Sequence, residues 1–317
     1  MSDPHSLPDR TARVRSMRLP DGRRLTYEEF GDRDGLPLLF FHGTPSSSRI
    51  ARLIDRAAAE ARCRLIALNR PGLAGSSFQV GRRIADWPAD VGLAAEQLGI
   101  PRFHVCGHSG GAPYALACAI SLAERVAAVA VLGGALPQEV AAGAPLSPEA
   151  RATLRQFERP RSRRRAIALS GWLASLLVPR RLVEHSAARL PPADLAFFRA
   201  PGVAEIFAED LKAALQDGGR GAVHDHWLIG EPAGLELGAV RCPVSIWYGE
   251  DDRTAHPDFG PALASAIDRS ELHLLPGVGH LSLLGDFGQV VRSLRQSASL
   301  DSGLRPVGSD PRPARSR

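Results

Sequence analysis

The residues best suited to chemistry lie in the segment FHVCGHSGGAPYALACA (103–119). An apolar strand is expected to run into GHSGG (107–111), and a helix of small residues follows at once. This pattern is typical of a nucleophile elbow, in which a serine lies on a sharp strand-to-helix turn with its hydroxyl exposed. Side chains at the glycines two positions before and after Ser109 would collide with the neighbouring strand and helix. The N-terminus of the following helix also directs backbone N–H groups and its positive dipole end toward charge developing at Ser109.

A serine hydroxyl becomes an effective nucleophile only when a base takes its proton and a carboxylate orients that base. In an open parallel sheet, these partners lie at the carboxyl ends of later strands. One apolar run ends in GEDDRT, which offers Asp251 and Asp252, and the next ends in a Gly-flanked loop that contains His280. The order Ser109, Asp252, His280 is the one expected of such a sheet. We therefore predict these three as nucleophile, acid and base, with Asp252 favoured over Asp251.

Acyl transfer also needs two backbone donors for the oxyanion. One should be the amide of Gly110, which follows the nucleophile. The other should come from the loop His42-Gly43-Thr44-Pro45, where Gly43 permits a tight turn and Pro45 fixes the direction in which the chain leaves. The Thr44 amide is thus the predicted second donor, and His42 is expected to brace the loop by hydrogen bonds.

The other histidines are weaker candidates for the base. His108 neighbours the serine but is expected to point away from it. His224 and His226, in the run HDHW, could suggest a metal site, but this spacing in a polar stretch favours surface residues. We therefore predict no metal site. Three further histidines have no acid partner implied by the sequence: His104, His256 and His273.

The elements that must position these residues alternate between strand and helix. The segment 14–31 predicts a β-hairpin around a Pro-Asp-Gly turn. The strands that follow are continuous apolar runs, which indicates a parallel sheet covered by helices on both faces. The expected strands are 37–43, 63–69, 102–106, 126–132, 242–249 and 271–277, with helices near 47–62 and 86–99.

Between about 135 and 235 the sequence is helical in character and offers no convincing strand. We interpret 135–235 as a helical cap inserted into a core formed by 13–134 and 236–297, because caps in this position cover the site and shape its pocket. Residues 1–12 and 298–317 are polar and are expected to be disordered, the latter as a basic tail.

Inside the expected cap, the Arg-rich segment 151–165 could face an anionic substrate or a membrane surface, although a solvated helix face is favoured. The apolar segment 166–178 is too short to cross a bilayer and is expected to be a helix buried against the pocket.

The composition of the chain restricts its partners and its compartment. Its net charge of +5 comes from arginine, which supplies all but one of the 39 basic residues. Because the basic residues are not interleaved with aromatic ones, we expect no nucleic-acid partner. No segment reaches a membrane span and the N-terminus has no apolar leader, so a cytoplasmic protein is expected. The cysteines, in or beside apolar runs, should be reduced and buried: Cys63, Cys106, Cys118 and Cys242.

Taken together, six blocks in order make the chain resemble the α/β-hydrolase fold family in its capped form. The resemblance covers roughly 14–295 and is carried by PDGRRLTYEEFG, FFHGTPSSS, LNRPGLAGSS, GHSGG, WYGEDDRT and PGVGHLSLL. It implies an eight-stranded, mostly parallel sheet with Ser109, Asp252 and His280 as its triad and with Thr44 and Gly110 as oxyanion-hole amides.

The resemblance also limits the chemistry. Relatives that open epoxides or cleave carbon–halogen bonds use an aspartate nucleophile, against which Ser109 argues, and proline iminopeptidases usually carry HGGPG where this chain has HGTPSSS. The leading expectation is a cofactor-independent serine hydrolase acting on a small or medium carboxylic ester. The alternatives are a triad-bearing ligand-binding or signalling protein with little turnover, and an amidase or proline iminopeptidase-like peptidase. The family also includes C–C bond hydrolases and perhydrolases, and fold alone does not choose among them.

Overall fold

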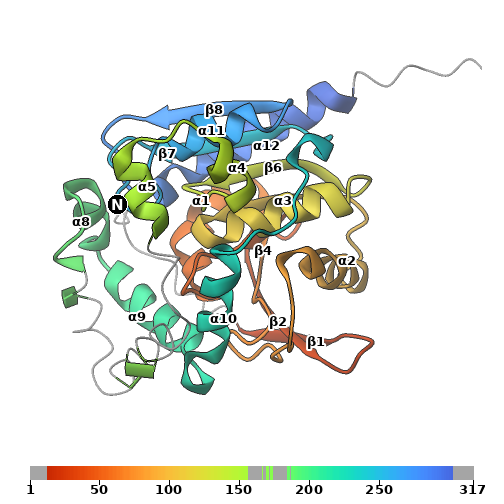
Figure 1. Cartoon of the computed structure of the whole chain (residues 1–317). Coiled ribbons are helices and arrows are strands. Elements are labelled where there is room, and N and C mark those ends of the chain that lie inside the picture. The colour runs from red at the N-terminus through yellow and green to blue at the C-terminus, as the bar shows by residue number, and fades with distance from the viewer. Residues whose placement is uncertain are drawn as a thin grey trace, which may run out of the picture.

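The computed structural model of this chain describes residues 13–155 and 187–302, and between them only 166, 169, 170, 172, 173, 184 and 185. Its centre is an eight-stranded sheet with the order β1-β2-β4-β3-β5-β6-β7-β8 (Figure 1). The strands are β1 (Arg15–Arg18), β2 (Arg24–Gly31), β3 (Leu36–Phe41), β4 (Cys63–Leu68), β5 (Phe103–His108), β6 (Val126–Leu132), β7 (Val244–Gly249) and β8 (Ser270–Leu275).

The sheet is mostly parallel. Strand β2 pairs antiparallel with β1 and β4, and every other pairing is parallel. The β1–β2 hairpin closes where Gly22 donates its N–H to the carbonyl of Leu19. The eight-stranded sheet, its mixed direction and the hairpin are therefore confirmed.

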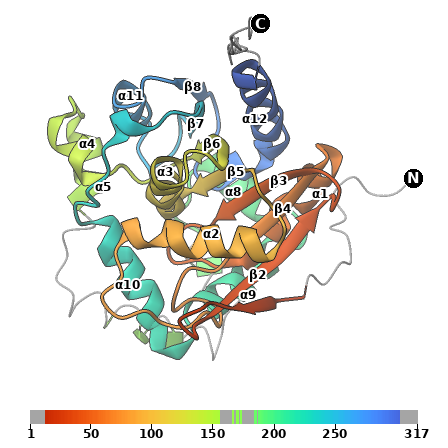
Figure 2. The ribbon, with the colours of Figure 1, turned by 90° about the vertical axis from the view of Figure 1, so that its right-hand side faces the viewer.

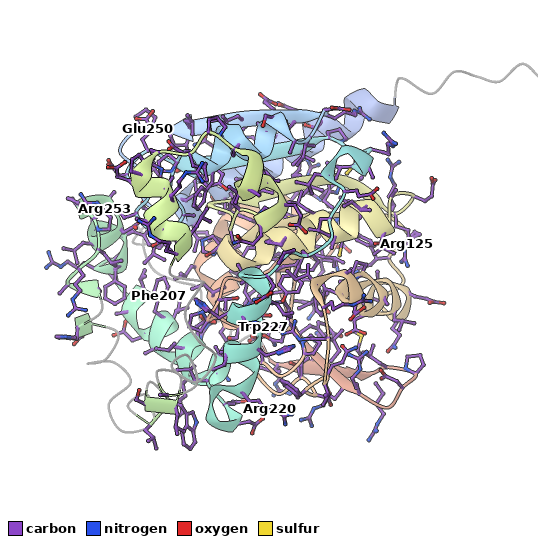
Figure 3. The ribbon with its side chains drawn as sticks, viewed as in Figure 1. Arg125, Phe207, Arg220, Trp227, Glu250 and Arg253 are labelled. Atoms are coloured by element: carbon purple, nitrogen blue, oxygen red, sulfur yellow. The ribbon has the colours of Figure 1, made fainter. Side chains whose placement is uncertain are left out.

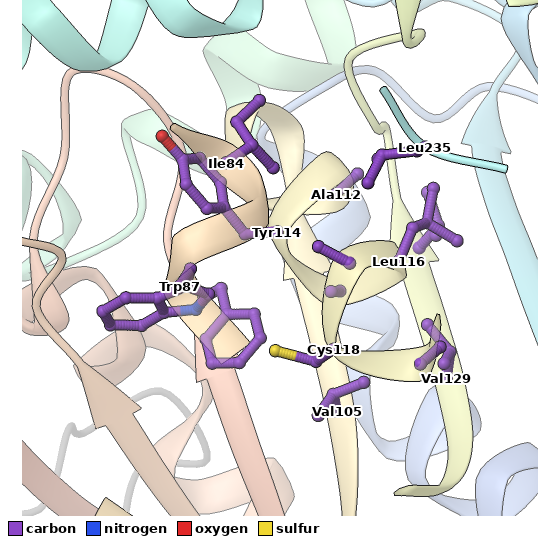
Figure 4. Close-up of a cluster of buried hydrophobic side chains, with 14 of the residues drawn as sticks. Ile84, Trp87, Val105, Ala112, Tyr114, Leu116, Cys118, Val129 and Leu235 are labelled. Atoms are coloured by element: carbon purple, nitrogen blue, oxygen red, sulfur yellow. The ribbon is translucent and has the colours of Figure 1, made fainter. Parts of the chain in front are cut away.

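Alternate residues of the strands face two separate cores, as expected for a sheet covered on both sides. Leu39 and Phe41 of β3 pack in one core, with residues of α2 (Trp87–Gln97), α3 (Ala112–Ser121) and α11 (Phe259–Ser265). Leu38 and Phe40 pack in the other, with residues of α1 (Asp55–Glu60) and α12 (Phe287–Ser302). Figure 4 shows part of the first core, where side chains of α3 meet those of β5, β6 and α2, and Figure 2 shows α2 and α3 together in front of the strands.

One expected helix is different in kind. The segment 47–62 forms a 3-10 helix, Ser48–Ile54, before it continues as α1. The Ser47 hydroxyl accepts a hydrogen bond from the N–H of Arg49, a local bond that tightens the first turn.

The chain between β6 and β7, residues 133–243, is called the β6–β7 segment below. It contains α4 (Gln138–Gly143), α5 (Pro148–Leu154), α8 (Pro192–Phe198), α9 (Val203–Ala214) and α10 (Arg220–Ile229), and its described residues form no strand. Figure 1 shows α8, α9 and α10 grouped on one side of the molecule. Most of the Arg-rich segment 151–165 and of the apolar segment 166–178 lies outside the described residues.

The two ends of the chain also lie largely outside the description. Residues 1–12 and 303–317 are not described, and α12 extends to Ser302, into the tail that was expected from residue 298. The described residues include all four cysteines, which are buried and joined by no disulfide. Within the same residues, no helix combines the length and apolarity needed to cross a membrane.

Candidate active site

The strand-to-helix turn after β5 has the geometry of a nucleophile elbow. Ser109 has a φ of +53°, a left-handed conformation that is rare outside glycine and costs energy in a serine. A Cβ on Gly107 would lie 2.6 Å from the carbonyl oxygen of Gly111, and one on Gly111 would collide with the carbonyl of Phe41. The steric requirement for both glycines, predicted from the sequence, is confirmed.

Asp252 and His280 meet at the carboxyl ends of β7 and β8. His280 Nδ1 lies 2.7 Å from Asp252 Oδ2, and both side chains are almost fully buried. The other oxygen of Asp252 accepts the N–H groups of Thr254 (2.7 Å) and Ala255 (2.8 Å), which fixes the carboxylate. Asp251 is exposed. The structure therefore pairs His280 with Asp252, the acid that the sequence favoured.

The environment of His280 favours a charged imidazole. Burial alone would lower the pKa of His280, but the negative charge and hydrogen bond of Asp252, with a smaller contribution from Asp194, raise it above its ordinary value. His108 is a close neighbour, since its ring centroid lies 5.0 Å from that of His280. Burial and the nearby His280 lower the pKa of His108 to about 3, so His108 stays neutral.

Gly133, at the end of β6, is a residue that the sequence did not single out. Its φ is +49°, and a Cβ there would lie 3.0 Å from His280 Nδ1 and 3.2 Å from Asp252 Oδ2. A side chain at this position would press directly on the acid–base pair. No sequence motif marks it, because the requirement arises from the neighbouring strands.

The loop after β3 lies against the elbow, as expected. A Cβ on Gly43 would lie 3.2 Å from Ser109 Cβ, and one on Gly110 would lie 2.8 Å from Thr44 Oγ1 and 2.6 Å from Ile229 Cδ1. Thr44 and Gly110 are thus neighbours beside Ser109. The buried His42 bonds through Nδ1 to the carbonyl oxygen of Gly43 at 2.9 Å, a contact within the loop.

A buried charge network holds this loop to α10, and the sequence reasoning missed it. Asp225, in the HDHW run that was expected at the surface, is fully buried, which corrects that expectation. Its carboxylate accepts hydrogen bonds from Thr44 Oγ1 at 2.6 Å, Arg70 Nη2 at 2.5 Å and Arg82 Nη2 at 2.8 Å. Burial alone would raise the pKa of Asp225, but the two arginines hold it well below the ordinary value. Tyr114 also donates its hydroxyl to this carboxylate, at 2.7 Å.

Arg70 connects this network to the backbone of the loop. Its guanidinium also donates to the carbonyls of His42 (2.5 Å) and Gly43 (2.8 Å). A planar guanidinium presents its donors from three nitrogens in a rigid fork, whereas a lysine donates from a single nitrogen. The available sequence signal was an arginine two residues after the apolar strand β4, in the block LNRPGLAGSS.

Two further buried aspartates of the β6–β7 segment hold loops of the site. Asp210 of α9 accepts hydrogen bonds from the Ser46 hydroxyl (2.8 Å) and from the N–H (2.7 Å) and hydroxyl (2.6 Å) of Ser47. Asp194 of α8 accepts the N–H groups of His280 (2.9 Å), Leu281 (2.8 Å) and Ser282 (2.9 Å). Three helices that are remote in sequence from the site residues therefore anchor the loops that carry them.

His224 and His226 do not form a metal cluster. In the part of the chain that the structure describes, no group of three or more His, Cys, Asp or Glu side chains could hold a metal ion. His224 instead packs its ring 5.5 Å from that of Phe78 and 5.6 Å from that of Trp227. No described histidine other than His280 pairs with Asp252.

The sheet order and the strained serine elbow define an α/β hydrolase. The chain belongs to the α/β hydrolase fold family, whose model matches residues 37–287.

Known proteins add relatives of several activities. The chain is 27% identical over 263 residues to the dihydrolipoyllysine-residue acetyltransferase component of the acetoin cleaving system of Pseudomonas putida, in a match that covers 82% of this chain and 62% of that protein. It is 25% identical over 264 residues to the putative carbamate hydrolase RutD of Klebsiella pneumoniae, covering 82% and 89%. Among solved structures, a thermophilic esterase from Thermogutta terrifontis superposes with a TM-score of 0.65 at 22% identity, covering 92% and 99%. The last likeness concerns the fold alone.

Proposed function

We propose that this protein is a serine hydrolase that cleaves a small or medium carboxylic ester through an acyl-enzyme. Asp252 accepts the Nδ1 proton of His280, which leaves Nε2 as the basic nitrogen. That nitrogen takes the proton of the Ser109 hydroxyl as Ser109 attacks the ester carbonyl. The alcohol leaves with a proton from His280, and a water activated by the same histidine then releases the acid and regenerates Ser109.

The Gly110 and Thr44 amides serve in this proposal as donors to the oxyanion of each tetrahedral intermediate. The close approach of Thr44 to Gly110 beside the elbow supports this role. The α10 network supports it further, because Asp225 and Arg70 bond to the side chain of Thr44 and leave its backbone free of that task. No metal or organic cofactor takes part in these steps.

One observation carries the proposal: a serine at a φ of +53° on an elbow, with a buried His280–Asp252 pair at the same edge of the sheet. The name of one similar protein, a putative carbamate hydrolase, agrees with hydrolysis at a carbonyl carbon. The acetyltransferase component also carries out acyl chemistry by its name, but this chain spans only 62% of its length.

We further propose that residues 135–235 of the β6–β7 segment act as a cap over this site and that 13–134 and 236–297 form the core. Support comes from the contacts of Asp194, Asp210 and Asp225, which attach α8, α9 and α10 to the loops around the site. Through these contacts, a movement of the helices would change the positions of site residues.

Two measurements test the proposed function. A fluorophosphonate probe should label the wild-type protein and leave Ser109→Ala unlabelled, since the probe reacts with an activated serine. A series of p-nitrophenyl esters of increasing chain length should reveal turnover by the wild type alone. Persistent labelling of Ser109→Ala would remove Ser109 from the mechanism.

The ester series and one added substrate, a chromogenic proline amide, separate the alternatives. Binding of the esters without turnover would favour a ligand-binding or signalling protein. Release of N-terminal proline from a chromogenic amide, with poor ester turnover, would favour a peptidase. Either result would replace the ester-hydrolase proposal.

A further inference from the structure

A cavity lies outside the candidate active site. It has a volume of about 630 Å³ and is bounded by the loop 78–83 and by α10. This volume is within the range of cavities that hold small organic ligands, roughly 300–1,000 Å³. Ser109, His280, Thr44 and Gly110 are not among its lining residues.

Helix α10 separates this cavity from the elbow. Asp225 and Ile229, four residues apart, face Thr44 and Gly110. Arg220, His224 and Trp227, also spaced by four and three residues, line the cavity. At 100° per residue, the two sets lie on opposite faces of the helix. Figure 3 shows Arg220 and Trp227 along α10.

The wall of the cavity is aromatic. Phe78, His224 and Trp227 form a row in which neighbouring ring centroids lie 5.5 Å and 5.6 Å apart. Two of the most exposed large apolar side chains of the described residues, Val80 at 81% and Leu169 at 47%, also line the cavity. Apolar groups that gather around a hollow and remain exposed are typical of a surface that binds something.

The lining is also positively charged. Among the described residues, the lining includes Arg82, Arg83 and Arg220 and no acidic side chain. Arg83 pairs with the exposed Asp86 at 2.9 Å, whereas Arg220 lies over the Phe78 ring at 3.8 Å and forms no ion pair within the described residues. An anion in the cavity would therefore meet guanidinium groups without displacing a lining carboxylate.

Arg82 supplies an unsatisfied donor in this wall. Its side chain is only 2% exposed, and Nη1 and Nη2 donate to the Tyr114 hydroxyl and to Asp225. Its Nε–H has no partner among the described residues. A buried donor left without an acceptor costs free energy. The Arg82 Nε is covered by its neighbours, so a ligand oxygen would recover that cost only after the surrounding side chains shift.

We propose that this cavity binds a small organic carboxylate with an aromatic body. The ring would pack against the Phe78–His224–Trp227 row, and the carboxylate would bond to the guanidinium groups of Arg82 and Arg220, since such pairs are strong and directional. The ligand would then contact, through Arg82, the same Asp225 carboxylate that holds Thr44. Binding at this site does not depend on the acyl chemistry proposed for Ser109.

Isothermal titration calorimetry with 4-phenylbutyrate tests the proposal on the full chain. The wild type should bind it with a Kd of about 1 mM or below, and the neutral 4-phenylbutyramide should bind at least about tenfold more weakly. Arg220→Gln removes one charge of the lining, and Val223→Trp fills the cavity from α10. Both variants should weaken carboxylate binding at least about tenfold. Arg292→Gln, an exposed arginine on α12, is the matched control and should bind as the wild type does.

Thermal unfolding followed by circular dichroism verifies that each variant is folded. If Val223→Trp does not fold, Arg220→Gln alone tests the site. Absence of heat with the wild type would overturn the proposal. So would equal affinity for acid and amide, because the carboxylate is then not recognised. Unchanged binding by a folded Arg220→Gln would refute this site, and unchanged binding by a folded Val223→Trp would do the same, since the ligand would then bind elsewhere.

Discussion

Replacing Asp194 by asparagine should impair catalysis although the side chain lies on α8, far in sequence from every predicted catalytic residue. The carboxylate is 1% exposed and accepts the N–H groups of His280, Leu281 and Ser282. It also accepts the Ser282 hydroxyl at 3.0 Å. Asparagine has the same shape but only one acceptor oxygen. Its NH2 group must therefore face at least one of the backbone N–H groups that the second carboxylate oxygen accepted.

The magnitude follows from the donor that is left without a partner. A buried N–H that loses its acceptor costs about 1–3 kcal/mol, and the loop can relieve that cost by moving. A displacement on the order of 1 Å at a catalytic group can reduce the rate about 10²-fold. We therefore expect Asp194→Asn to lower kcat/KM for p-nitrophenyl butyrate about tenfold to hundredfold, mainly through kcat.

The variant should also change the pH profile. Burial lowers the pKa of His280, and the charges of Asp252 and, to a lesser extent, Asp194 overcome it and raise the pKa. A base works when unprotonated, so a raised pKa places the acid limb of kcat/KM at a higher pH. Removing the Asp194 charge lowers the pKa of His280, and the limb should move to lower pH. A purely structural defect would reduce activity without moving it.

The assay is kcat and KM measured from about pH 5 to pH 9, with thermal unfolding to verify the fold. Glu139→Gln is the matched control, because Glu139 lies in the same β6–β7 segment and accepts the backbone N–H groups of Gly234 and Leu235. Its profile should match that of the wild type. If Asp194→Asn kept the wild-type kcat/KM and an unshifted limb, the argument that this carboxylate positions and charges His280 would be wrong.

Three more predictions test other contacts of the site. Asp252→Asn should reduce kcat by about 10³-fold or more, whereas substitution of the exposed Asp251 by asparagine should change kcat little. Steady-state kinetics measure both variants, and the reverse ranking would assign the acid role to Asp251. Gly110→Ala should lower kcat and destabilise the fold by about 1–3 kcal/mol, because a Cβ there would collide with Thr44 and Ile229. A wild-type kcat for this variant would show that these two residues move aside at no cost. Asp225→Asn should destabilise the protein by about 3–5 kcal/mol at pH 7, since two buried arginines lose their counter-charge. Because the pKa of Asp225 is lowered in the folded state, the difference in unfolding free energy between wild type and variant should shrink as the pH falls below about 4. Urea unfolding measures this difference, and a gap between the two midpoints that grew on acidification would contradict the prediction.

The fold was accessible from sequence because it depends on local patterns. Continuous apolar runs separated by helical stretches predicted the parallel sheet, and each predicted strand of the core agrees with an observed one to within a few residues. The Gly-x-Ser-x-Gly spacing predicted the elbow, since only glycine fits where Gly107 and Gly111 approach the backbone. The nature of the 47–62 helix was less accessible, because over one or two turns a period of 3.0 residues is hard to distinguish from one of 3.6.

By itself, then, the sequence determined the family, the order of the elements and the identities of Ser109, Asp252 and His280 as candidates. These follow from residue types at fixed distances along the chain. The tertiary structure alone decided which buried charges hold the site loops. Asp194, Asp210 and Asp225 lie on ordinary helices, and nothing near them in sequence distinguishes them from solvated aspartates. They become buried anchors only when α8, α9 and α10 pack over loops that are from about 80 to 180 residues away in the chain. Burial is a property of that packing, and it is burial that turns a surface carboxylate into a fixed hydrogen-bond acceptor.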